Sequence, residues 1–65
     1  MLKNTKDAIE FKSTETRGKV KREFITTMEG IANFSGYVEA LRDMGLITEQ
    51  ERKQTINEFS SKILQ

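Results

Sequence analysis

The residues of this chain that could do chemistry are mostly charged, and four cations gather in the segment Arg17-Gly18-Lys19-Val20-Lys21-Arg22. Such a cluster near the start of a predicted helix could bind phosphate groups. The candidate nucleic-acid contacts are therefore Arg17, Lys19, Lys21 and Arg22. No aromatic side chain is interleaved among them to stack on bases. A basic face that contacts only solvent is the first alternative, and an acidic protein partner is the second.

Residue types that serve in catalysis or metal binding are scarce. The chain has no cysteine and no histidine, which excludes disulfides, thiolate zinc sites and histidine-based catalysis. The acidic residues form no pair with a reason to be desolvated, so general acid or base catalysis has no candidate. The four glycines are isolated and none opens a helix after a strand, which argues against a phosphate-binding loop. We expect no enzyme activity, no cofactor, no metal and no small-molecule substrate.

Length and composition point to a single small helical domain over residues 1–65. Apolar residues make up 35% of the chain and charged residues 32%, and proline is absent. Residues 1–28 hold seven basic against four acidic residues, whereas residues 29–65 hold four against six. No stretch approaches the roughly 20 apolar residues of a membrane span, and the N-terminus lacks the apolar core of a signal peptide. We therefore expect a cytoplasmic protein without a membrane segment.

Hydrophobic periodicity predicts a long first helix, over about residues 16–44. Apolar residues recur every three or four positions from Val20 to Leu41, which is the spacing of one helix face. Gly30 and Gly36 lie inside this pattern, so a break near residues 33–36 is the alternative. Residues 1–13 are expected to form a flexible or extended arm, either irregular or a short strand, because apolar and charged residues alternate at positions 9–12.

A tight corner follows the first helix. Gly45 can adopt the left-handed conformation that closes a helix. Thr48 and Glu51 have the spacing of a capping box, which predicts a second helix over about residues 49–64. The fold class is then all-α, an antiparallel helical hairpin in which the adjacent apolar residues Leu46 and Ile47 fill the inside of the corner.

Residues 41–51 support one family resemblance. The residues that carry it are Leu41, Gly45, Leu46, Ile47, Thr48 and Glu51. They resemble the core of the short C-terminal (SHOCT-type) helical hairpin found at the ends of many bacterial and phage proteins. Arg52 stands where that family often has an aromatic residue. The resemblance implies an interaction or oligomerisation module and provides no catalytic residues.

The unequal helix lengths predict where a partner binds. At 1.5 Å per residue, a helix over residues 49–64 covers only the C-terminal half of one over 16–44. Apolar side chains on the other half would need to be covered, either by the N-terminal arm or by a second molecule, and we favour the second molecule. The interface candidates are Val20, Phe24, Ile25, Met28 and Tyr37. We therefore expect a homodimer that acts as a small regulatory or inhibitory protein of bacterial or phage type and binds a protein partner. The alternative is a dimeric DNA-binding transcriptional regulator that uses the basic N-terminal half.

Overall fold

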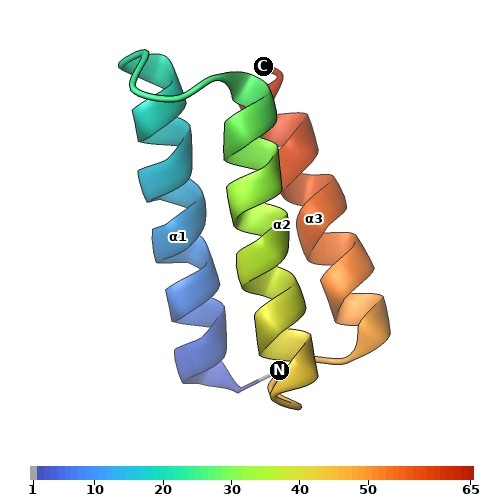
Figure 1. Cartoon of the computed structure of the whole chain (residues 1–65). Coiled ribbons are helices and arrows are strands. Elements are labelled where there is room, and N and C mark those ends of the chain that lie inside the picture. The colour runs from blue at the N-terminus through green and yellow to red at the C-terminus, as the bar shows by residue number, and fades with distance from the viewer. Residues whose placement is uncertain (1) are drawn as a thin grey trace.

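The computed structural model describes residues 2–65 and shows three helices, α1 (Lys3–Lys21), α2 (Thr27–Asp43) and α3 (Glu49–Ile63). They run up, down and up, so α1 and α3 are parallel to each other and antiparallel to the central α2 (Figure 1). Both outer helices pack against α2, and the molecule measures 33 × 18 × 17 Å. The all-α class is confirmed, and no strand occurs in residues 2–65. The architecture, however, is a three-helix bundle and not a hairpin.

The two corners of the bundle have the same backbone structure. After α1, the Phe24 N–H donates to the Lys19 carbonyl and the Glu23 N–H to the Val20 carbonyl, at 2.9 and 3.0 Å. After α2, Leu46 and Gly45 repeat this pair of bonds at 3.0 and 2.9 Å. This is the Schellman arrangement, which satisfies carbonyls at a helix end when one residue turns left-handed. That residue is Glu23 in the first corner (φ 63°) and Gly45 in the second (φ 76°).

Each corner then ends in a capping box. The hydroxyl oxygen of Thr48 accepts from the Glu51 backbone N–H at 3.1 Å, and the Glu51 carboxylate accepts from the Thr48 N–H at 2.9 Å. Thr26 and Glu29 make the same two bonds, both at 3.1 Å, at the start of α2. The predicted second corner is confirmed, and the predicted second helix agrees with α3 to within one residue at its end.

The prediction of one helix over residues 16–44 is wrong, because the chain turns at residues 22–26. The spacing Thr26-x-x-Glu29 matches Thr48-x-x-Glu51, so a local signal for this turn was present in the sequence. It was hidden because Val20, Phe24 and Met28 continue the four-residue apolar spacing straight across the corner. The helix does not break at residues 33–36, since α2 continues through Gly30 and Gly36.

The prediction of an irregular or extended arm over residues 1–13 is also wrong for the residues that the structure describes. Helix α1 begins at Lys3, and Met1 lies outside the described part of the chain. The face of α1 that packs inward carries mainly small polar residues. Its buried positions are Thr5, Ile9, Ser13 and Thr16. Their spacing of three or four is helical, but a pattern based on apolar residues does not detect it.

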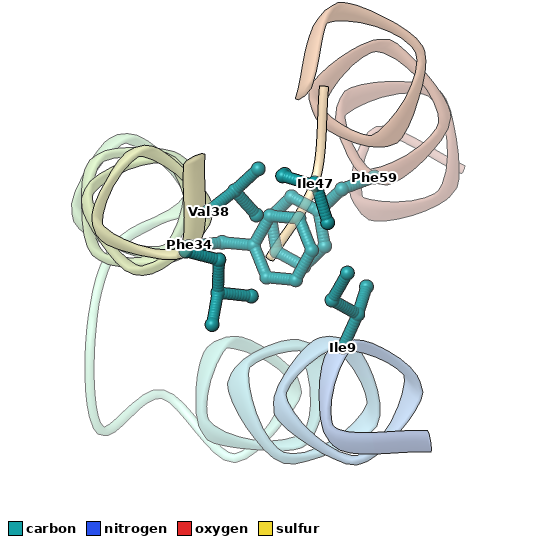
Figure 2. Close-up of a cluster of buried hydrophobic side chains, with 6 residues drawn as sticks. Ile9, Phe34, Val38, Ile47 and Phe59 are labelled. Atoms are coloured by element: carbon teal, nitrogen blue, oxygen red, sulfur yellow. The ribbon is translucent and has the colours of Figure 1, made fainter. Parts of the chain in front are cut away.

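The core lies between the three helices and is centred on α2. Its buried apolar residues are Ile9, Phe34, Val38, Leu41, Ile47 and Phe59. Figure 2 shows that Ile9 from α1, Ile47 from the second corner and Phe59 from α3 converge on Phe34 and Val38 of α2. The three helices also approach one another closely at Gly30 of α2. A Cβ atom at this position would lie 2.8 Å from Val20 Cγ2 of α1 and 3.0 Å from Ile63 Cδ1 of α3. Val20, one of the residues expected to need a second molecule, is thus partly covered within the bundle by packing against α2.

Candidate binding surface

An exposed apolar patch lies at the corner between α1 and α2. We call the residues Phe24, Ile25 and Met28 the Phe24 patch, and Val20 lies next to it but is partly buried against Gly30 of α2. Phe24 is 70% exposed and Met28 78% exposed. Val20, Phe24 and Ile25 line a shallow hollow that also includes Glu23 and Glu29, and Met28 lies on the first turn of α2. Four of the five predicted interface residues are therefore at or next to one corner of the bundle.

Comparison of the two corners shows that the exposure of Phe24 does not follow from local backbone structure. Phe24 and Leu46 occupy equivalent positions, directly after the left-handed residue, and Ile25 and Ile47 are the next equivalent pair. Leu46 packs against the core and Ile47 is buried, at 6% exposure. In the first corner Phe24 is largely exposed and Ile25 only partly buried. The same motif thus places a partly buried and a fully buried residue at one end of the bundle, whereas at the other end Phe24 is largely exposed and Ile25 partly buried.

Arg22 lies against this patch. Its guanidinium carbon is 5.3 Å from the centre of the Phe24 ring, within the range of a cation–π contact. The guanidinium also lies close to Gly18, where an added Cβ atom would be 3.2 Å from one of its terminal nitrogens. Arg22 therefore folds back over the end of α1 and forms part of the surface that a ligand of Phe24 would meet.

The four predicted nucleic-acid contacts do not form one face. Residues four apart lie on the same side of a helix, so Arg17 and Lys21 are neighbours. Lys19 lies about 200° around the helix from both of them. Arg17 and Lys21 line a groove between α1 and α3, together with Val20, Lys62 and Ile63. Sequence reasoning missed Lys62, which is far away in the chain and is brought there only by the parallel packing of α1 and α3.

Tyr37, the fifth predicted interface residue, lies elsewhere. It is half-buried in α2, packs against the core and has the Lys12 ammonium 5.7 Å from its ring centre. It lies nine residues after Met28, which is about 14 Å along the helix axis. The structure therefore does not bring Tyr37 into the Phe24 patch.

A network of ion pairs joins α2 and α3 next to the second corner. Arg52 donates two hydrogen bonds to the Glu49 carboxylate, at 2.7 and 2.6 Å, and its other terminal nitrogen lies 4.0 Å from Glu39. Arg42 Nε lies 3.5 Å from the same Glu49 carboxylate. The hydrogen bonds from Arg52 lower the pKa of Glu49 to about 2. These charges pair with one another, which favours a role in joining the helices over a role in binding.

Comparisons with protein families, curated proteins and solved structures found no match to this chain. The resemblance of residues 41–51 to the short C-terminal helical hairpin therefore stays a prediction. In residues 2–65 no group of acidic side chains is arranged to hold a metal ion. Across the same residues, none of the helices combines the length and apolar character needed to cross a membrane.

Proposed function

We propose that this chain is a small regulatory or inhibitory protein that acts by binding a protein partner through the Phe24 patch. The observation that supports it is the difference between the two corners, which share a backbone structure but not the burial of their apolar residues. Packing Phe24 and Ile25 inward, as Leu46 and Ile47 are packed, would stabilise the fold at about 25 cal/mol per Å² of apolar area. A surface that forgoes this stabilisation is typical of a binding site.

The chemistry of the patch suits a protein ligand. Aromatic and arginine side chains dominate the binding energy of protein interfaces, and Phe24 is in contact with Arg22. Met28, on the first turn of α2 near the same corner, adds an exposed and flexible apolar side chain, and flexible side chains can adapt to the shape of a partner. We infer that the partner offers an apolar pocket large enough for the Phe24 ring.

The experiment that tests this proposal compares two phenylalanines of equal exposure. Phe11 is also 70% exposed, but it lies mid-helix in α1 and its neighbours one turn away are Asp7, Ala8, Thr14 and Glu15. The immobilised wild-type protein and the variants Phe24→Asp and Phe11→Asp would be used to capture proteins from the native host. We expect a partner that is retained by the wild type and by Phe11→Asp and lost from Phe24→Asp. Equal capture by all three proteins would contradict the proposal.

A second candidate function, binding of nucleic acid, is favoured by the convergence of Arg17, Lys21 and Lys62 on one groove. Three cations from two helices could follow a phosphate backbone. Titration with DNA at low and high salt tests this candidate, with the triple alanine variant of these residues as the comparison. Binding that weakens with salt and is lost in the triple variant would support a DNA-binding regulator. Absence of binding at low salt would eliminate it.

A further inference from the structure

The groove between α1 and α3 has opposite charges at its two ends. Both helices pack on α2 and run parallel to each other (Figure 1). Residues of both helices line two shallow hollows. The hollow nearer their N-termini has three acidic residues and one basic residue in its lining, and the hollow nearer their C-termini has three basic residues and no acidic one. The charged residues are Lys6, Glu10, Glu51 and Glu58 in the first, which we call the acidic end, and Arg17, Lys21 and Lys62 in the second, the basic end.

Most of these charges are not neutralised within the protein. Among residues 2–65, neither Glu10 nor Glu58 forms an ion pair, and the same holds for Lys21 and Lys62. Arg17 makes a hydrogen bond of 3.3 Å to the Ser13 hydroxyl. Glu10 and Lys21 lie about 16 Å apart along α1, so the two ends form separate charged areas and do not compensate each other locally.

We propose that a second copy of this chain docks on the α1–α3 face in antiparallel orientation. The two-fold axis lies in the plane of the interface, at right angles to the groove and midway between its ends. Rotation about this axis brings the acidic end of each copy onto the basic end of the other. Both contacts are then favourable, and the assembly closes as a dimer because the interface is isologous. A parallel arrangement would place like charges together at both ends.

The dimensions of the molecule indicate a weak dimer. A face of 33 by 18 Å offers about 600 Å² per copy, which places the contact at the low end of specific interfaces. Its apolar part is small, since Val20 and Ile63 are the apolar residues of the basic end and Ile9 that of the acidic end. Attraction between exposed charges is screened by salt. We therefore expect dimerisation at low ionic strength and a much weaker association at high ionic strength.

The inference specifies how the homodimer expected from the sequence forms, and it does not depend on the protein partner proposed for the Phe24 patch. The two copies cannot pair through a helix over residues 16–44, because the chain turns within this range and forms two helices. Sedimentation equilibrium of the whole chain at about 20 mM and about 500 mM salt would measure the dimer dissociation constant across this change in screening.

Charge reversal provides the decisive variants. In Lys21→Glu/Lys62→Glu both ends of the face become acidic, and in Glu10→Lys/Glu58→Lys both become basic. Each variant alone should dimerise at least about tenfold more weakly than the wild type, because like charges then face each other. Mixed in equal amounts, the two should form a 1:1 heterodimer with an affinity near that of the wild type. Circular dichroism would confirm that each variant is folded.

Three outcomes would overturn the inference. They are a wild-type protein that stays monomeric at low salt, reversed variants that dimerise as well as the wild type, and a mixture that does not associate. A dimer that resists salt and is lost in Phe24→Asp would place the contact at the Phe24 patch instead. Capture of the protein partner by a wild-type protein that stays monomeric at low salt would show that failure of this inference leaves the proposed function intact.

Discussion

The rings of Phe34 in α2 and Phe59 in α3 stack face to face, with centroids 4.0 Å apart and planes inclined by 10°. Phe34 is 1% exposed and Phe59 2% exposed, and they are among the largest fully buried side chains of the structure. Because α1 contributes only Ile9 to the buried apolar cluster, this pair holds much of the contact between helices. The stability of the bundle therefore depends strongly on either ring.

Replacing Phe59 with alanine should lower the free energy of unfolding by about 3–5 kcal/mol, from lost transfer energy and the cavity left behind. A domain of this size has only about 3–10 kcal/mol in total, so the substitution should remove at least about a third of its stability. Urea denaturation followed by circular dichroism measures the change. Phe11→Ala, at an exposed position, is the control and should change stability by less than about 0.5 kcal/mol. A comparable loss in both variants would contradict the assigned core.

The left-handed residues of the two corners give opposite predictions. Glu23 has a φ of 63°, which is unfavourable for a residue with a Cβ atom, so Glu23→Gly should stabilise the fold by up to about 1 kcal/mol. Glu23→Ala retains the Cβ atom and serves as the control for loss of the charge. Gly45→Ala should destabilise by about 1–2 kcal/mol, although its Cβ atom would meet no neighbour within 4 Å. Thermal unfolding of the three variants would test the assigned corner geometry.

Gly30 and Gly36 lie in the same helix but in different surroundings. An alanine Cβ at position 36 would have nothing within 4 Å, so Gly36→Ala should stabilise α2 by up to about 1 kcal/mol. At position 30 the added atom would lie 2.8 Å from Val20 Cγ2, on a branched and rotationally stiff side chain. Overpacking of about 1–3 kcal/mol should then outweigh the gain in helix propensity. Stabilisation by Gly30→Ala would show that the three helices do not converge there.

Stability should decrease in acid through the carboxylates at the start of α3. Hydrogen bonds from Arg52 lower the pKa of Glu49 from 4.5 to about 2, and the Thr48 backbone N–H lowers the pKa of Glu51. A lowered pKa in the folded state means that the charged form favours folding. Its contribution is complete above pH 4.5 and, for Glu49, is lost as the pH falls to about 2.

Melting temperatures between pH 6 and pH 2 would measure this effect. Glu49→Gln should show a smaller decrease over this range than the wild type, and added salt should reduce the difference because the carboxylate is exposed. Asp7→Asn removes an exposed carboxylate that has no ion pair among residues 2–65, and it serves as the matched control. An unchanged pH profile in Glu49→Gln would contradict the assigned role of the Arg52 contact.

How far the fold could be predicted depended on where each signal lay in the chain. The corner at Gly45 was predictable because a glycine and a capping box act over fewer than ten residues. The corner at Glu23 has the same capping signal, but a glutamate takes the left-handed position, and the apolar spacing continues through Phe24. The part of α1 before residue 16 was missed, since its buried positions are mainly threonine and serine, which show no hydrophobic periodicity.

For the candidate surfaces, some residues could be identified from the sequence, but their grouping in space could not. Phe24 and Met28 were identified from the sequence as apolar residues in need of a partner, and both are exposed. The sequence also located Arg17 and Lys21, but their separation from Lys19 follows from the helix rotation, and their grouping with Lys62 depends on the packing of α1 beside α3. The opposite charges of the α1–α3 face come from segments about 40 residues apart in the sequence.

The sequence by itself determined the helical class, the caps and the second corner, because these features depend on interactions between residues a few positions apart. Only the tertiary structure decided that the first corner exposes Phe24 while the second buries Ile47, and that two outer helices form one face with an acidic and a basic end. The burial of a side chain and the charge of a surface depend on which segments, distant in the chain, pack next to each other. Their arrangement is therefore set by packing and not by local sequence.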